Sequence, residues 1–163
     1  MSTSGTYVAA KLQESVVLDN LHLEKTGCEL TDFRKIGGGY LHDWYLVHFG
    51  SCFDDDESLQ NIKRLSFLNA VYYLEFEEHV MASTATKFEK GKTIWSVKKD
   101  SSSWQNSGLE FEGEPPESVK EMERKNLAEG NNLFEVPVDL FVSIVGYHYM
   151  DDDCTFEELQ STQ

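Results

Sequence analysis

The chain has few basic residues: 14 Lys and Arg face 29 Asp and Glu, which leaves a net charge of −15 and a pI of about 4.6. At long range such a charge repels the phosphates of nucleic acids and of anionic membranes. It steers the protein toward basic partners, in an association that weakens as salt rises. We therefore expect a basic protein partner, no nucleic acid and no membrane. The acidity can also serve solubility alone, and this alternative stays open.

Long apolar runs and cysteines are also scarce. The longest wholly apolar runs are far shorter than the roughly 20 residues that a membrane-spanning helix needs. Three cysteines, at Cys28, Cys52 and Cys154, are too few and too scattered for a disulfide framework. The first residues lack a basic start followed by an apolar stretch, so no secretory signal is expected. Together these features favour a cytoplasmic location.

Sequence motifs of the common enzyme classes are missing. There is no G-x-S-x-G, P-loop, H-E-x-x-H or paired C-x-x-C, and the five histidines never fall at the spacing of metal ligands. The acidic runs that begin at Asp54 and Asp151 lack the glycine at position six and the glutamate at position twelve of a calcium loop. We expect no metal, no cofactor and no catalytic residue, and lean against an enzyme. A Cys–His pair assembled only in three dimensions stays open.

The hydrophobic patterns predict an α+β fold, with an antiparallel sheet of about four to six strands packed with helices. The length fits a single domain over residues 1–163, with flexible residues 1–6 and an acidic C-terminal tail, 151–163. Capping acids and apolar stripes predict helices around 55–66, 116–129 and 137–146. Strands are expected around 16–23, 40–49, 70–78, 80–88, 92–99 and 108–112.

The stretch 70–99 carries the clearest hairpin and much of the positive charge. Glu89-Lys90-Gly91-Lys92 has the composition of a hairpin loop. Between residues 87 and 99 five lysines face one glutamate, a charge of +4 in a chain whose remainder sums to −19. Lysines commonly block the edge of a sheet, and we favour this explanation over a binding patch. The triple glycine 37–39 is interpreted as a flexible approach to the next strand.

The leading functional hypothesis is a binding protein that occludes a basic partner, as an immunity or antitoxin-like inhibitor does. Its partner-binding residues are expected in two acidic runs and two nearby tyrosines: Asp54, Asp55, Asp56, Glu57, Tyr147, Tyr149, Asp151, Asp152 and Asp153. The alternative is a small enzyme or ligand-binding protein, with a sheet pocket lined by Glu78, His79 and Trp95. A further alternative is a self-associating structural protein that pairs the 87–99 hairpin with an acidic face of another copy. Whether Trp104 is buried or presented to a partner stays open.

Overall fold

One antiparallel sheet of nine strands organises the protein in a computed structural model that describes residues 4–52, 56–100, 108–130 and 133–163. The strand order is β2-β9-β3-β4-β1-β5-β6-β7-β8, so the predicted α+β class is confirmed and the sheet is larger than predicted. The elements are β1 (Ser4–Ala10), α1 (Glu14–Leu21), β2 (Leu23–Glu29), β3 (Ile36–Leu41), β4 (Trp44–Phe49), α2 (Asp56–Leu65), β5 (Val71–Glu77), β6 (Ala82–Glu89), β7 (Lys92–Lys99), β8 (Glu110–Gly113), α3 (Ser118–Ala128), α4 (Glu135–Val145) and β9 (Glu157–Ser161).

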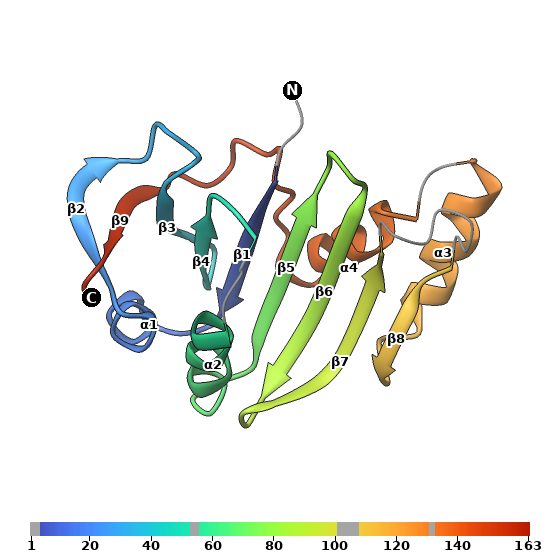
Figure 1. Ribbon diagram of the computed structural model, residues 1–163, viewed down its shortest axis with the longest axis horizontal. Helices are drawn as coiled ribbons and strands as arrows, with labels where there is room; N and C mark the ends of the chain where they lie inside the picture. The colour runs from blue at the N-terminus through green and yellow to red at the C-terminus, as the bar shows by residue number, and fades with distance from the viewer. Residues whose placement is uncertain (1–3, 53–55, 101–107, 131–132) are drawn as a thin grey trace.

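Helices pack on both faces of the sheet, because successive side chains of each strand point to opposite faces. On one face, here called the α2 face, Ile62 and Leu65 of α2 are buried with Val8 and Tyr45 of the sheet. On the other, the α4 face, Phe141 of α4 belongs to a buried cluster that includes side chains of β1, β4 and β5. Figure 1 shows α2 in front of the strands and α4 behind them. None of the helices in the described part of the chain is long and apolar enough to cross a membrane.

Both ends of the chain belong to the sheet. Residues 4–6, predicted within a flexible N-terminus, begin β1, which pairs with β4 and β5 at the centre of the sheet. The Thr6 side chain is buried there and its hydroxyl donates to the Ser51 carbonyl at 3.0 Å. Within the predicted acidic tail, residues 157–161 form β9 between β2 and β3. Both segments are ordered by pairing with strands that are distant in the sequence, and not by their own local hydrophobicity.

Two local predictions are wrong. Residues 16–23 were predicted as a strand, but α1 covers Glu14–Leu21 because Val17, Leu18 and Leu21 form one buried helical side. The predicted strand 40–49 is a hairpin of β3 and β4, and its turn includes His42 at a φ of 55°.

The β6–β7 hairpin is where the sequence placed it. Lys90 and Gly91 have φ of 53° and 77°, the left-handed pair that suits a tight hairpin. The edge-blocking explanation of its lysines is wrong, however, because β8 pairs with β7 and makes β7 an inner strand. The lysines also divide between environments: Lys99 is buried and donates to the Asp100 carbonyl at 3.0 Å, while the Lys87 ammonium lies 5.7 Å from the centre of the Tyr72 ring.

Candidate functional site

The part of the α2 face formed by β5, β6, β7 and β8 is polar. The strand register places side chains of these four strands in two neighbouring rows across the sheet. One row is Tyr73, Thr86, Ser96 and Glu112, and the other is Glu75, Thr84, Lys98 and Glu110. Most of these side chains are half-buried or exposed. An antiparallel sheet can keep one face solvated in this way while the other face packs on the core.

The opposite face of β5, β6 and β7 is closed. Ser83, the neighbour of Thr84 in β6, points to the α4 face, is buried, and donates to the Phe134 carbonyl at 2.8 Å. Trp95 and Val97 of β7 are buried in the core on that face. In this part of the sheet, therefore, the α2 face is solvated while the α4 face is packed.

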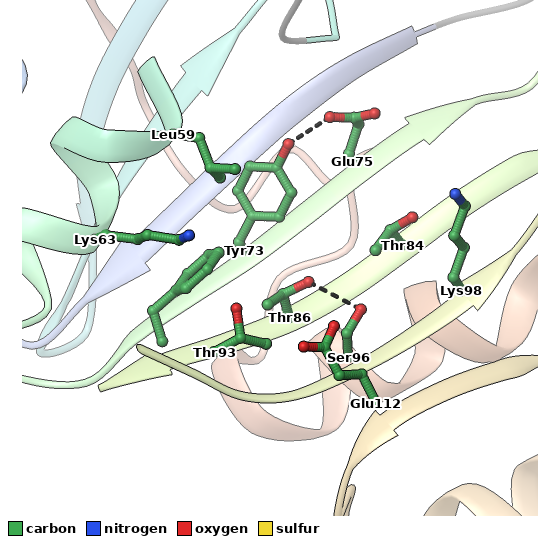
Figure 2. A pocket seen from close by; sticks show the side chains of 11 residues that line it. Leu59, Lys63, Tyr73, Glu75, Thr84, Thr86, Thr93, Ser96, Lys98 and Glu112 are labelled. Carbon is green, nitrogen blue, oxygen red and sulfur yellow. Dashed lines mark hydrogen bonds between the residues drawn. The ribbon is translucent and has the colours of Figure 1, made fainter. Parts of the chain in front are cut away.

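A groove of about 260 Å³ lies on this polar area, which we call the polar groove. Figure 2 shows α2 at one end, with Leu59 and Lys63 one helical turn apart, and strand side chains along the rest. The residues that line it are Leu59, Lys63, Tyr73, Glu75, Thr84, Thr86, Phe88, Thr93, Ser96, Lys98 and Glu112. The lining combines a small apolar part near α2 with hydroxyls and charges of both signs.

Hydrogen bonds within the groove hold several of these polar groups in place. The Tyr73 hydroxyl donates to the Glu75 carboxylate, and the Thr86 hydroxyl donates to Ser96 Oγ at 3.3 Å (Figure 2). Burial, and then the Glu75 charge, raise the pKa of Tyr73, so its proton stays on the phenol and fixes the carboxylate. The Tyr73 ring also meets Phe88 edge-on, with centroids 6.1 Å apart.

The charged groups of the groove are available to a bound molecule. Within the described residues, neither its two lysines nor its two glutamates form an ion pair with one another or with a neighbour. A cation in the groove can therefore bind Glu75 or Glu112 through charge-assisted hydrogen bonds, and a carboxylate or carbonyl can bind Lys63 or Lys98. This chemistry suits recognition of a charged, hydrogen-bonding guest.

Strand β8 forms one border of the groove and one edge of the sheet. All four of its residues are exposed, and Phe111 is 52% exposed. Glu112 lines the groove, so the edge and the groove are continuous. From residue 110 to residue 123 the sequence has six glutamates and one lysine, a charge of −5. Of these acids, Glu110 and Glu112 lie in β8, two residues apart and on the same face of the sheet.

The predicted partner-binding residues that the structure describes do not come together. Asp54 and Asp55 lie outside the described residues, while Asp56 and Glu57 are exposed in the first turn of α2. The run Asp151–Asp153 is exposed and follows Tyr149.

The two tyrosines of the prediction pack on the α4 face. Tyr147 is only 2% exposed and its ring lies 5.3 Å from that of Tyr7 in the core, so it offers no surface to a partner. Tyr149 is half-buried, stacks on Phe76 at 4.1 Å, and donates a hydrogen bond to Glu78. The run Asp151–Asp153 therefore follows tyrosines that pack on the α4 face, while Asp56 and Glu57 belong to α2 on the opposite face.

The residues proposed for a sheet pocket are also dispersed. Trp95 is buried in the core on the α4 face, and His79 is exposed in the turn after β5. Glu78 is occupied by Tyr149. The polar groove lies on the other face and includes none of the three. Trp104 lies outside the described residues.

A second group of acids lies at the start of α4. Burial raises the pKa of both Glu135 and Asp139, and the Asp139 charge raises the pKa of Glu135 further. His148 opposes the shift at both carboxyls. These acids are held close together, which costs stability when both are ionised.

Comparison with known proteins adds no relative: no family model, no curated protein and no solved structure matches the chain.

Proposed function

We propose that the protein is a small acidic binding protein that holds a basic segment of a partner protein in the polar groove. The observation that carries this proposal is the uncovered area of the α2 face, where carboxylates and hydroxyls stand in two cross-strand rows. The net charge of −15 supports it, because it steers a cationic partner toward the protein before contact.

The groove dimensions favour side chains over a cofactor. Its volume of about 260 Å³ is below the roughly 300 Å³ at which small-molecule and cofactor sites usually begin. A Lys or Arg side chain that enters it meets Glu75, which the Tyr73 hydroxyl already orients. Such preorganisation lowers the entropy lost on binding. The groove lysines then select the orientation of the segment by repelling its cations and donating hydrogen bonds to its carbonyl oxygens.

The concrete form of this function is an inhibitor that works by occlusion, as immunity and antitoxin proteins do. A partner whose active site is cationic would be covered when that site docks on the groove. Electrostatic steering would set the association rate, and the contacts within the groove would set the lifetime of the complex.

The test uses decalysine as the basic segment and measures its dissociation constant by calorimetry at low and high salt. Glu75→Gln with Glu112→Gln removes both groove carboxylates and keeps their shape. We expect it to weaken binding about tenfold, which corresponds to about 1.4 kcal/mol. The matched control, Glu24→Gln with Glu29→Gln, removes two charges from exposed residues of β2 at the other edge of the sheet and should change binding only about twofold.

Equal weakening in the two double variants would show that decalysine binds the net charge and not the groove, and would refute the proposal. Circular dichroism of each variant confirms that the fold is kept. A second candidate, a pocket for a small zwitterionic ligand, is favoured by the charges of both signs that line the groove. Calorimetry with free lysine beside decalysine separates the two, because a small-ligand pocket would bind free lysine as tightly as decalysine.

A further inference from the structure

The outer side of β8 is an open edge of the sheet. Among the residues that the structure describes, no strand pairs with this side, and β8 is the last strand in the order. The backbone N–H and C=O groups of an open edge are a template for another strand. A bound peptide can use them as an added strand, with side-chain contacts supplying the specificity.

The side chains of β8 specify what such a strand should contain. Glu110 and Glu112 point to the α2 face, since they pair with Lys98 and Ser96 of the two polar rows. Phe111 between them points to the α4 face and is exposed. Residues directly opposite on neighbouring strands interact most strongly, and opposite charges are favourable there. The matching strand therefore has basic residues at alternate positions and an apolar residue between them.

A second copy of the chain does not fit this edge. If two β8 strands paired antiparallel around Phe111, Glu110 of one copy would face Glu112 of the other at both ends of the pair. Like charges directly opposite destabilise a strand pair. The charges that prevent self-association thus select a basic strand from another protein.

The other edge of the sheet is less suited to strand addition. Strand β2 has a register irregularity between Lys25 and Glu29 and a glycine at φ 88° within it. Such irregularities twist a strand edge away from further pairing. Lys25 is also occupied by Glu14 and Glu157.

We propose that a part of the basic segment that lies outside the polar groove binds as an added strand along β8, with its alternate Lys or Arg side chains beside Glu110 and Glu112 and the apolar residue between them on Phe111. This inference rests on the proposed function and names how the partner is held. Strand β8 has four residues, or about 13 Å at 3.3 Å per residue. A partner segment of about five residues is long enough to cover it.

The experiment uses the acetylated and amidated peptide Gly-Lys-Val-Lys-Val-Lys-Gly and two versions of it, one N-methylated at the lysines and one at the valines. Only alternate N–H groups of a strand face the neighbouring strand. Strand addition therefore predicts that one methylated version binds about tenfold more weakly and that the other binds like the parent. Hydrogen exchange of the β8 amides should slow when the parent peptide binds.

Glu110→Gln with Glu112→Gln should weaken the parent peptide about tenfold, and the β2 double variant described above is again the control. If both methylated versions bind like the parent, or if β8 exchange is unchanged, strand addition is refuted while the proposed function stands. If decalysine binds and the alternating peptide does not, strand addition is again refuted and the proposed function stands. If neither binds, the proposed function fails and this inference with it.

Discussion

Replacing Gly39 by alanine tests the packing of β3 against the segment before β9. A Cβ atom at this position would lie 2.4 Å from the Thr155 carbonyl oxygen and 3.2 Å from Cys154 Sγ. The first distance falls about 1 Å short of an ordinary contact, which begins at 3.4 Å. Because the obstacle is backbone, it cannot rotate away as a side chain would.

The cost follows from what the displaced segment holds. Thr155 stands between the buried Cys154 and Phe156, and the Phe156 carbonyl accepts from the Leu30 N–H at 2.9 Å. Moving this segment disturbs the core on the α4 face, and overpacking of this kind costs about 1 to 3 kcal/mol. We expect Gly39→Ala to lower the free energy of unfolding by about 2 to 3 kcal/mol, which corresponds to a fall of about 4 to 12 °C in Tm.

Urea and thermal unfolding followed by circular dichroism measure this loss. Gly108→Ala is the control, because a Cβ there meets none of the residues that the structure describes within 4 Å. The control should leave stability unchanged or raise it by a few tenths of a kcal/mol, since alanine restricts the unfolded chain. If Gly39→Ala remains within about 0.5 kcal/mol of the original protein, the range of an ordinary surface substitution, the packing described for β3 is wrong.

Two further predictions concern the α4 face. Glu135→Gln should raise stability at pH 7 by a few tenths of a kcal/mol, because burial and the Asp139 charge raise the pKa of Glu135 and so disfavour its ionised form in the folded state. The original protein recovers this stability as the pH falls through the raised pKa of Glu135. The urea midpoints of the two proteins should therefore converge near pH 4. If Glu135→Gln raises the urea midpoint equally at pH 7 and at pH 4, the cause is not electrostatic. Tyr147→Ala should cost about 3 kcal/mol in urea unfolding, because Tyr147 is buried; weaker binding of decalysine without loss of stability would instead restore this residue to the binding surface.

Elements with a strong local pattern were predictable from the sequence. The β-branched and aromatic residues of Val71–Glu77 and the turn at Lys90-Gly91 correspond to β5 and to the β6–β7 hairpin. The acids before an apolar stripe correspond to α2. In each case the information lies within about ten neighbouring residues, where periodicity and capping act.

The strands that the sequence analysis missed depend on partners elsewhere in the chain. Strand β3 contains the triple glycine, which looks flexible in sequence, yet Cβ atoms at Gly37, Gly38 or Gly39 would collide with residues from three other segments. Strand β9 is rich in acids, and it is ordered by pairing on both sides with β2 and β3. Neither reason is visible locally, which is why the predicted sheet was too small.

The polar groove could not be predicted for a related reason. Its two rows exist only because the register of four strands aligns Tyr73 with Thr86, Ser96 and Glu112, and Glu75 with Thr84, Lys98 and Glu110. Each residue alone occupies an ordinary position in a strand. If the register of one of these strands shifted by one residue, its side chains in the two rows would point to the opposite face of the sheet.

The same alternation corrects how charge should be counted along a strand. The lysines between residues 87 and 99 form one cluster in the sequence, but Lys98 points to the groove while its neighbour Lys99 is buried. A sum over consecutive residues therefore overstated a cationic ridge there. In β8 the two glutamates are two residues apart, so they share one face and their charges add. Counting every second residue weakens the case for a lysine patch and strengthens the case for an acidic edge at β8 that selects a basic strand.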